Sequence, residues 1–516
     1  MSTAASLSEK HPDYTMFAPD WVLMRDTYRG ERQVKAKGPI YLPYTSGHIE
    51  DGIANDKAPG WRAYQAYKLR ARFPNYIRQA VQIALGMLHH QPAEIELPDD
   101  MKDIKSSRGE TMEQLLMRIN KEQILMGRVG LMMDLPRNAP VGADRPYLAL
   151  YNAERIINWD NGTVEDNVPQ SLNLVVLDES EQERVNTFSW EASEKYRVLT
   201  LGPPDTNEGA GRYRFGVFND DAGFSVGGLK TASYRGRGLD YIPFWFINAV
   251  DHVVEPEDPP LLDLANLCMT IYRGEADYRQ NLFMQGQDTF VTIGANLDDT
   301  ENVRTGAGAR LDLPSGASAE YVGVTSDGLE EQRTSLENDR AIAGAMGAQS
   351  IDTTSRERES GKSLNIRLAA RTADLNQIAI SGGMGLQAAL RGVAEWMGLN
   401  PEEVNVRPNM EFGDAPITGQ MMVDIAAAAN QGWPISTKTM HDMSRQKGLT
   451  KLTFEEETKF LDEDHEKAMK RAQENAKIQA AAAAVRDVGG GNGDRNQSQA
   501  RKGGSGGDNG GRNTSE

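Results

Sequence analysis

Apolar residues recur every three to four positions after the paired prolines at 259 and 260, and this spacing predicts an amphipathic helix. Prolines are tolerated at a helix start because the first N–H groups have no partner inside the helix. One face of this helix is therefore expected to pack against a neighbour. Its apolar positions are Leu261, Leu264, Cys268, Ile271, Ala276 and Leu282.

Two short β-like runs follow, at residues 290–293 and 319–322, with glycines and prolines between them. Such punctuation predicts a small β module. A second helix is expected over residues 329–346, where Leu336 and Ile342 form a sparse apolar stripe among charged residues. This pattern is typical of a helix that keeps much of its surface in water. The predicted order is helix, β module, helix.

Residues 350–363 have no hydrophobic period and are rich in residues that favour loops, so a polar loop is expected there. Helical spacing of apolar residues resumes at Leu364 and continues to Met397. Gly382 and Gly383 interrupt this pattern. Because glycine weakens a helix interior, the two residues predict a kink.

The remaining chain mixes both kinds of periodicity. Helical patterns occupy much of residues 21–137, short β-like runs occupy residues 147–246, and a brief strand is expected at 404–408. Three further helices are predicted near residues 421–429, 437–446 and 454–485. The last segment, from 489 to 516, is dominated by Gly, Asn and Ser and cannot bury a core. The predicted fold class is α+β, predominantly helical.

Several segments, taken in order and spacing, resemble the portal proteins of tailed bacteriophages. They are residues 147–151 (YLALY), 242–246 (IPFWF), 260–267 (PLLDLANL) followed by Tyr272-Arg273, and 360–364 (SGKSL). The likeness extends from about Trp21 to Glu466. In that family, two stem helices flank a clip module, and a tunnel loop leads into a long kinked helix beneath a helical crown.

The resemblance implies a division of the chain into regions. These are an N-terminal arm (1–20), an α+β wing (21–255), a first stem helix (256–286), a clip (287–325), a second stem helix (326–349), a tunnel loop (350–363), a long kinked helix with a wing strand (364–412), a helical crown (413–486) and a disordered Gly-rich tail (487–516). Stem packing would fall to Leu261, Leu264, Cys268, Ile271, Leu336 and Ile342.

The family's function implies a ring of about twelve copies at one capsid vertex, through which double-stranded DNA is packaged and ejected without sequence recognition. Implied partners are the terminase large subunit, major capsid and scaffold proteins, and head-completion, adaptor and tail proteins. The expected location is the virion, after assembly in the host cytoplasm. The chain would be neither an enzyme nor a cofactor carrier, because ATP hydrolysis belongs to the terminase.

In a tunnel loop, Arg356, Arg358 and Lys362 would contact DNA phosphates transiently, since Glu357 and Glu359 alternate with them. An equally open interpretation is an exposed, self-neutralising loop that contacts a neighbouring subunit. Two other functions compete with a portal. A minor capsid or head–tail adaptor protein would share the ring but should lack paired helices around a β insert, and a nucleic-acid-processing enzyme would need a catalytic motif.

Composition narrows these functions only slightly. The formal net charge of −18 argues against tight, nonspecific gripping of nucleic acid and suits a channel that repels DNA from its walls. The single cysteine, Cys268, excludes an intrachain disulfide and fits a reduced, cytoplasmic setting. No run reaches the roughly eighteen apolar residues of a membrane span, and no export signal is expected.

Candidate catalytic and metal motifs are weak. Gly361-Lys362-Ser363 resembles the end of a phosphate-binding loop, but Arg356 stands where the first glycine belongs. His89-His90 lacks further ligands at metal-binding spacing, and the acidic run around Asp462 lacks the glycine and spacing of a calcium loop. The helix-turn-helix pattern near residue 440 is followed by acidic segments, which disfavours DNA reading. No metal site is expected.

Overall fold

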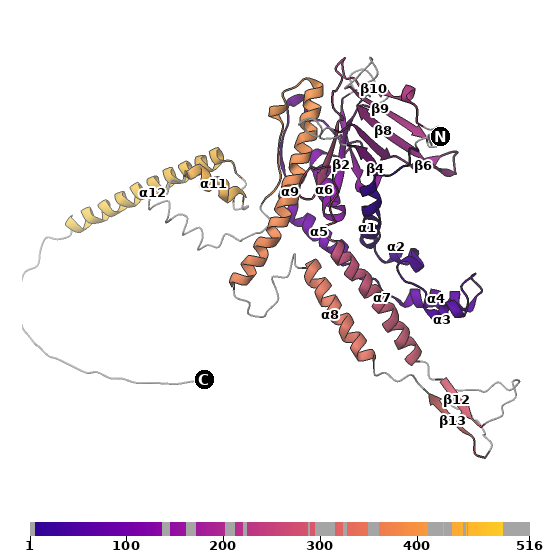
Figure 1. The fold of residues 1–516 in the computed structure, drawn as a ribbon. Coiled ribbons are helices and arrows are strands. Elements are labelled where there is room, and N and C mark those ends of the chain that lie inside the picture. Colours follow the sequence, from indigo (N-terminus) through magenta and orange to yellow (C-terminus); the bar gives the residue numbers. More distant parts are fainter. Residues whose placement is uncertain are drawn as a thin grey trace, which may run out of the picture. The chain divides into compact units, whose positions relative to one another are not determined.

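The structure is a computed structural model that describes residues 6–136, 145–160, 172–201, 212–219, 224–286, 289–294, 315–322, 328–348, 361–410, 436–446 and 452–488, together with isolated positions at 427 and 450. Side chains are described over most of these ranges; at 361–372, 479–488 and a few further positions the structure describes the backbone alone. The chain divides into two compact units, residues 1–414 and 415–516. Helices and antiparallel sheets together make the fold α+β (Figure 1).

The first unit opens with a set of helices. Helix α1 begins at Pro12, where the His11 side chain accepts a hydrogen bond from the Asp13 N–H, and Tyr14 and Phe17 are buried. The expected boundary between an arm and the wing at residue 21 therefore falls inside α1, whose aromatic residues pack into the core. The helices are α1 (Pro12–Arg29), α2 (Glu31–Ala36), α3 (Ser46–Glu50), α4 (Pro59–Arg70) and α5 (Tyr76–Leu88).

A three-stranded antiparallel sheet lies at the centre of this unit, in the order β11-β2-β3. Every residue of its middle strand β2 is buried. Helix α6 leads directly into β2 and ends at Gly127, whose φ of 79° is the left-handed conformation that glycine adopts readily at a helix end. The bounds are α6 (Met112–Met126), β2 (Arg128–Asp134), β3 (Tyr147–Asn152) and β11 (Phe244–Asn248).

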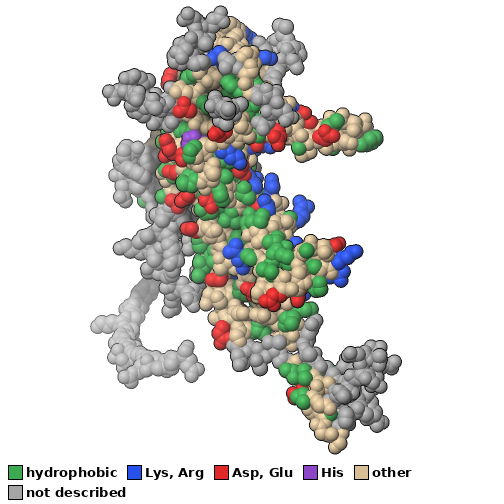
Figure 2. Space-filling model, turned by 45° about the vertical axis from the view of Figure 1, so that its right-hand side comes forward, with side chains coloured by type: hydrophobic (Ala, Val, Ile, Leu, Met, Phe, Trp, Pro, Cys, Tyr) green, Lys and Arg blue, Asp and Glu red, His purple; other side chains and the backbone are tan. Residues whose placement is uncertain are grey.

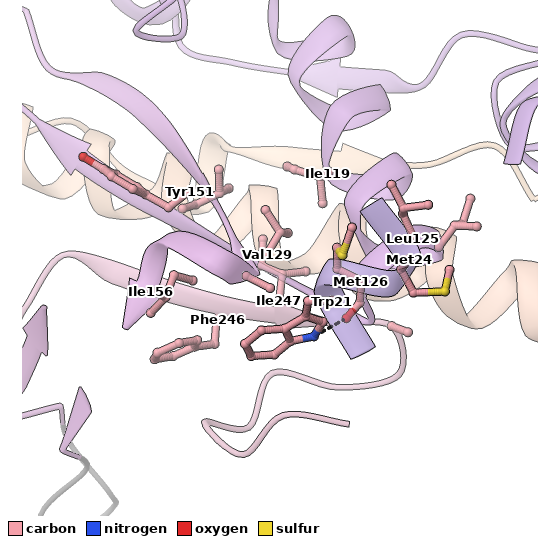
Figure 3. Close-up of a cluster of buried hydrophobic side chains, with 14 of the residues drawn as sticks. Trp21, Met24, Ile119, Leu125, Met126, Val129, Tyr151, Ile156, Phe246 and Ile247 are labelled. Atoms are coloured by element: carbon pink, nitrogen blue, oxygen red, sulfur yellow. Dashed lines mark hydrogen bonds between the residues drawn. The ribbon is translucent and has the colours of Figure 1, made fainter. Parts of the chain in front are cut away.

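The core joins α1, α6 and this sheet (Figure 3). Trp21 is fully buried, and its indole N–H donates to the backbone oxygen of Met126 at 3.1 Å. Because a buried indole N–H needs a partner, this bond fixes α1 against the junction between α6 and β2.

A second antiparallel sheet has the order β10-β9-β8-β5-β4, and a separate hairpin pairs β6 with β7. Strands β5, β8 and β9 lie within residues 147–246, where short β-like runs are expected. The bounds are β4 (Ile156–Asp160), β5 (Leu174–Asp178), β6 (Glu181–Arg184), β7 (Trp190–Ser193), β8 (Lys195–Leu201), β9 (Tyr213–Asn219) and β10 (Lys230–Thr231).

The second half of the unit follows the predicted order of helix, β module, helix and long helix. A short strand, β14, then pairs with β1 from the first hundred residues. The bounds are α7 (Leu262–Gln285), β12 (Thr289–Ile293), β13 (Ser318–Val322), α8 (Leu329–Ala348), α9 (Gly361–Met397), β14 (Asn405–Arg407) and β1 (Glu94–Glu96).

The second unit contains α11 (Thr437–Gln446) and α12 (Phe454–Val488). Thr453 caps α12, because its hydroxyl accepts a hydrogen bond from the Glu456 N–H at 3.3 Å. Both helices match the predicted segments closely. The helix expected at 421–429, apart from one position, and the tail from residue 489 lie outside the described residues.

Candidate functional site: the paired helices and the hairpin between them

Helices α7 and α8 lie side by side and run in opposite directions (Figure 1). Near one end of the pair, a Cβ placed on Gly347 would lie 3.6 Å from the Leu264 side chain, and farther along, one on Gly274 would lie 3.0 Å from Leu336. Toward the hairpin, the Asn281 amide donates to the Gln332 side chain at 3.1 Å. Residue numbers rise along α7 as they fall along α8, so the pair is antiparallel.

A buried carboxylate ties the two helices together. Glu275 on α7 is only 2% exposed, yet it pairs with Arg340 on α8 and with Arg279 one turn along its own helix. A buried carboxylate is costly unless cations and hydrogen bonds surround it. Sequence reasoning missed this site, although a glutamate between Ile271 and Ala276 on an otherwise apolar face was a usable signal.

The first half of α7 is covered by more than α8. Leu264, Cys268 and Ile271 are all buried, because α1, α4 and α5 pack on the same helix. The Cys268 thiol lies beside the start of α5, and burial raises its pKa to about 11. Leu261 is half-buried, whereas Leu282 is exposed near the hairpin.

Of the two α8 residues expected to pack, Leu336 is buried within the chain, whereas Ile342 is 53% exposed. Packing of these residues between copies in a ring stays a prediction. The face of α8 that meets the rest of the unit instead contains Leu336, Ala343 and Gly347, which follow one another at intervals of seven and four residues. Because adjacent helical residues point about 100° apart, Ile342 is turned away from a contact made by Ala343.

The β12–β13 hairpin occupies the position predicted for the β module. Its register pairs Thr289 with Val322 and Ile293 with Ser318. Ile293 and Val322 are both about half exposed, at 58% and 46%. Within the described residues of this two-stranded module these apolar side chains stay half exposed, which favours contact with another surface.

The loop candidates fall mostly outside what the structure describes. Arg356 and Arg358 lie beyond the described residues, and Lys362 falls in the first turn of α9, where only the backbone is described. Their proposed contact with DNA stays a prediction.

Helix α9 continues through Gly382 and Gly383 without interruption. These glycines permit close approach: a Cβ on Gly382 would lie 2.4 Å from the Asn120 amide nitrogen, and one on Gly383 would lie 2.9 Å from Pro408. The packing of these glycines against α6 and against the residue after β14 gives a second reason for their presence. The kink expected at Gly382 and Gly383 stays a prediction.

A buried polar network joins α9 to α6 and to the end of β11. The Gln123 amide and the Ser381 hydroxyl both donate to the Asn248 backbone oxygen at 2.7 Å, and the Asn120 amide donates to the Ile378 oxygen at 3.3 Å. These bonds satisfy groups that would otherwise be expensive to bury. Polar residues inside the apolar pattern of α6 were the signal that sequence reasoning overlooked.

No group of three His, Cys, Asp or Glu side chains among the described residues could hold a metal ion. Within the same residues, no helix has the length and apolar character needed to cross a membrane. A cavity of about 410 Å³ lies beside Ile104, Tyr147 and Met397, with Asp100 and Asp103 also in its lining.

Comparisons with known proteins give one partial family match and several distant structures. A family model described as a domain of unknown function (DUF4055) matches residues 260–397, which span α7, the hairpin, α8 and α9. No curated protein sequence matches the chain.

Among solved structures, a chain from "Virion of native gene transfer agent (GTA) particle" is 13% identical with a TM-score of 0.37, covering 78% of this chain and 97% of that one. A chain from "Neck of native GTA particle computed with C12 symmetry" is 11% identical with a TM-score of 0.34, covering 78% and 97%. TM-scores below 0.5 do not define a shared fold.

Proposed function

We propose that this chain is the portal subunit of a tailed phage, which forms a ring around a channel for double-stranded DNA at one vertex of the capsid. The observation that carries the proposal is the arrangement of residues 262–397. Two antiparallel helices hold an exposed hairpin between their far ends, and a long helix follows in the chain. This order of elements agrees with the stem, clip and long helix that the resemblance to portals implies, and so supports the proposal.

Exposed apolar residues on the paired helices support assembly with further copies. Leu282 and Met284 on α7 are 42% and 46% exposed, and Ile342 and Met346 on α8 are 53% and 38% exposed. Exposed apolar groups of this kind favour contact with another protein surface. When the contact joins different faces of identical chains, and the rotation closes, the product is a ring.

The hairpin supplies the docking module of the proposal. Its exposed residues Ile293 and Val322 lie on a sheet that has two strands within the described part of the chain. The outer edge of such a sheet can bind a partner by adding a strand. The terminase would occupy this module during packaging, and head-completion or adaptor proteins would occupy it afterwards.

Electron micrographs of negatively stained particles, viewed end-on, test the ring directly. The proposal predicts annular particles with a central hole. Compact monomers or dimers under every assembly condition, without annular particles, would contradict it.

The expected loop between α8 and α9 supplies the DNA contact of the proposal. Replacing Arg356 and Arg358 with alanine removes two cations that would touch phosphates in passing. We expect rings of normal size that package less DNA or retain it less well, measured as DNA content of filled heads. If the variant assembles into rings and the amount and retention of packaged DNA are unchanged, the alternative is favoured, in which the loop contacts only a neighbouring subunit.

A further inference from the structure

Although the chain is acidic overall, two of its segments carry a local excess of positive charge. Segments 29–37 and 68–78 together contain eight Lys and Arg residues and one acidic residue, Glu31. The chain as a whole carries −18. Clusters of this kind are the electrostatic signature of a surface that binds phosphates, whatever the net charge of the protein.

The structure brings these two segments onto one surface. The Lys35 ammonium on α2 donates to the Leu69 backbone oxygen on α4 at 3.2 Å. The Arg78 guanidinium at the start of α5 donates to the Arg29 oxygen at the end of α1 at 2.8 Å. Two hydrogen bonds, one near each end, therefore join the segments into a single surface, which we call the basic surface. Figure 2 shows Lys and Arg side chains on the part of the molecule that these helices form.

Several cations of the basic surface are free to bind a ligand. Lys35 and Lys37 pair with Glu31 and Asp26 at 2.6 and 3.3 Å. Arg29, Arg32 and Arg72 are exposed, and none of them has a carboxylate partner among the described residues. These three guanidinium groups lie in an area that holds five further cations.

We propose that the basic surface binds the phosphate backbone of duplex DNA, without sequence recognition. Duplex DNA presents one negative charge per roughly 1.7 Å of axis, a density that matches closely spaced cations. Arginine also binds phosphate with two parallel N–H donors. An acidic protein surface or an anionic membrane fits less well, because Leu69 is the one exposed large apolar residue within the two segments, both of which the structure describes in full.

This inference goes beyond the proposed function, because the channel loop at 350–363 is a different segment of the chain. DNA held at the basic surface would lie on the wing-like part of the protein, at residues other than those of the channel loop.

Binding of the full-length protein to a small, covalently closed circular duplex tests the inference, because a closed circle cannot thread through a ring that has already assembled. The test variant is Arg32→Ala with Arg72→Ala, and the matched control is Lys230→Ala with Lys459→Ala, which removes the same charge from exposed sites elsewhere. We expect affinity at about 50 mM salt to fall at least about tenfold in the test variant, and the slope of log K against log salt to decrease by about 2. The control should bind like the wild type.

Three results would overturn the inference. One is unchanged affinity and salt slope in the test variant. Another is an equal loss in the control, which would show a general charge effect. The third is a test variant that still binds DNA but no longer binds polyglutamate or anionic phospholipid vesicles. Loss of polyglutamate binding would assign the surface to an acidic protein, and loss of vesicle binding would assign it to a membrane.

The outcome is separable from that of the proposed function. Annular particles whose binding to closed circles is unaffected by Arg32→Ala and Arg72→Ala would leave the portal proposal standing and remove this one. If the protein never forms rings but its DNA binding depends on Arg32 and Arg72, the basic-surface proposal would stand and the portal proposal would fail.

Discussion

At the scale of single residues, two buried polar side chains on α7 report on its packing. Cys268 is buried against the start of α5, and Glu275 is buried between two arginines. Neither arrangement would persist if α7 were a free-standing rod. Both residues therefore test whether the N-terminal helices and α8 cover this helix as described.

The Cys268 thiol should resist modification in the folded protein. Burial raises its pKa to about 11, so almost no thiolate exists near pH 8, and the sulfur is inaccessible. We expect a thiol reagent to label no cysteine in the native protein and one per chain in denaturant. Rapid labelling of native protein would show that α7 is uncovered.

The raised pKa of the Cys268 thiol also predicts that the stability of the protein falls as pH rises. The thiol pKa is about 8.5 in an unfolded chain and about 11 in the folded one, so its contribution is intact below about pH 8.5 and falls as pH rises toward 11. The free energy of unfolding should decrease over this range more steeply in the wild type than in Cys268→Ala. If the free energies of unfolding of the wild type and of Cys268→Ala fall equally with pH, the raised pKa of Cys268 would be contradicted.

Glu275 and Arg340 should be energetically coupled. We expect Glu275→Gln and Arg340→Gln each to destabilise the protein, and the double variant to lose less than the sum. A coupling of about 1–3 kcal/mol would be measured by a double-mutant cycle of urea unfolding. Glu330→Gln with Arg333→Gln is the matched control, because that exposed pair on α8 is 3.5 Å apart and should couple weakly. Additive effects of Glu275 and Arg340 would rule out the link between α7 and α8.

At the scale of elements, glycines in helices serve different purposes at different sites. A Cβ on Gly385 of α9 would lie 2.5 Å from the buried side chain of Ile247, whereas a Cβ on Gly86 of α5 would meet nothing within 4 Å. Both glycines lie inside a helix, so packing decides what an added methyl group does at each.

Gly385→Ala and Gly86→Ala should therefore have opposite effects. Alanine improves helix propensity by about 1 kcal/mol, and overpacking a core costs about 1–3 kcal/mol. We expect the urea midpoint to fall for Gly385→Ala, because the methyl group meets Ile247, and to rise for Gly86→Ala. A rise for both would mean that α9 is not seated on β11 as described.

The elements that could be predicted from sequence are those with strong local signals. The helix at Thr437–Gln446 and the α7 helix follow from apolar spacing and from the residues at their ends. Sequence spacing places Leu336 and Ile342 on one apolar stripe, but it does not reveal which neighbour covers each of them. The close contacts of the α9 glycines with Asn120 and Ile247 could not be predicted, because helix propensity is local and these partners are distant in sequence.

At the scale of the whole molecule, the arrangement of charge and apolar surface fits a subunit that works in an assembly. The paired helices expose apolar residues that one chain leaves in water, and the basic surface is concentrated on the N-terminal helices of an acidic protein. The buried site on α7 could be anticipated in part from its apolar stripe. The basic surface could not, because its two segments meet only in the folded chain.

The mass of the purified assembly in solution tests the central claim most directly. A portal subunit should give a closed ring with about twelve times the mass of one chain, and this mass should not change on dilution once the ring has formed. A mass equal to one or two chains at every protein concentration and ionic strength would contradict the account.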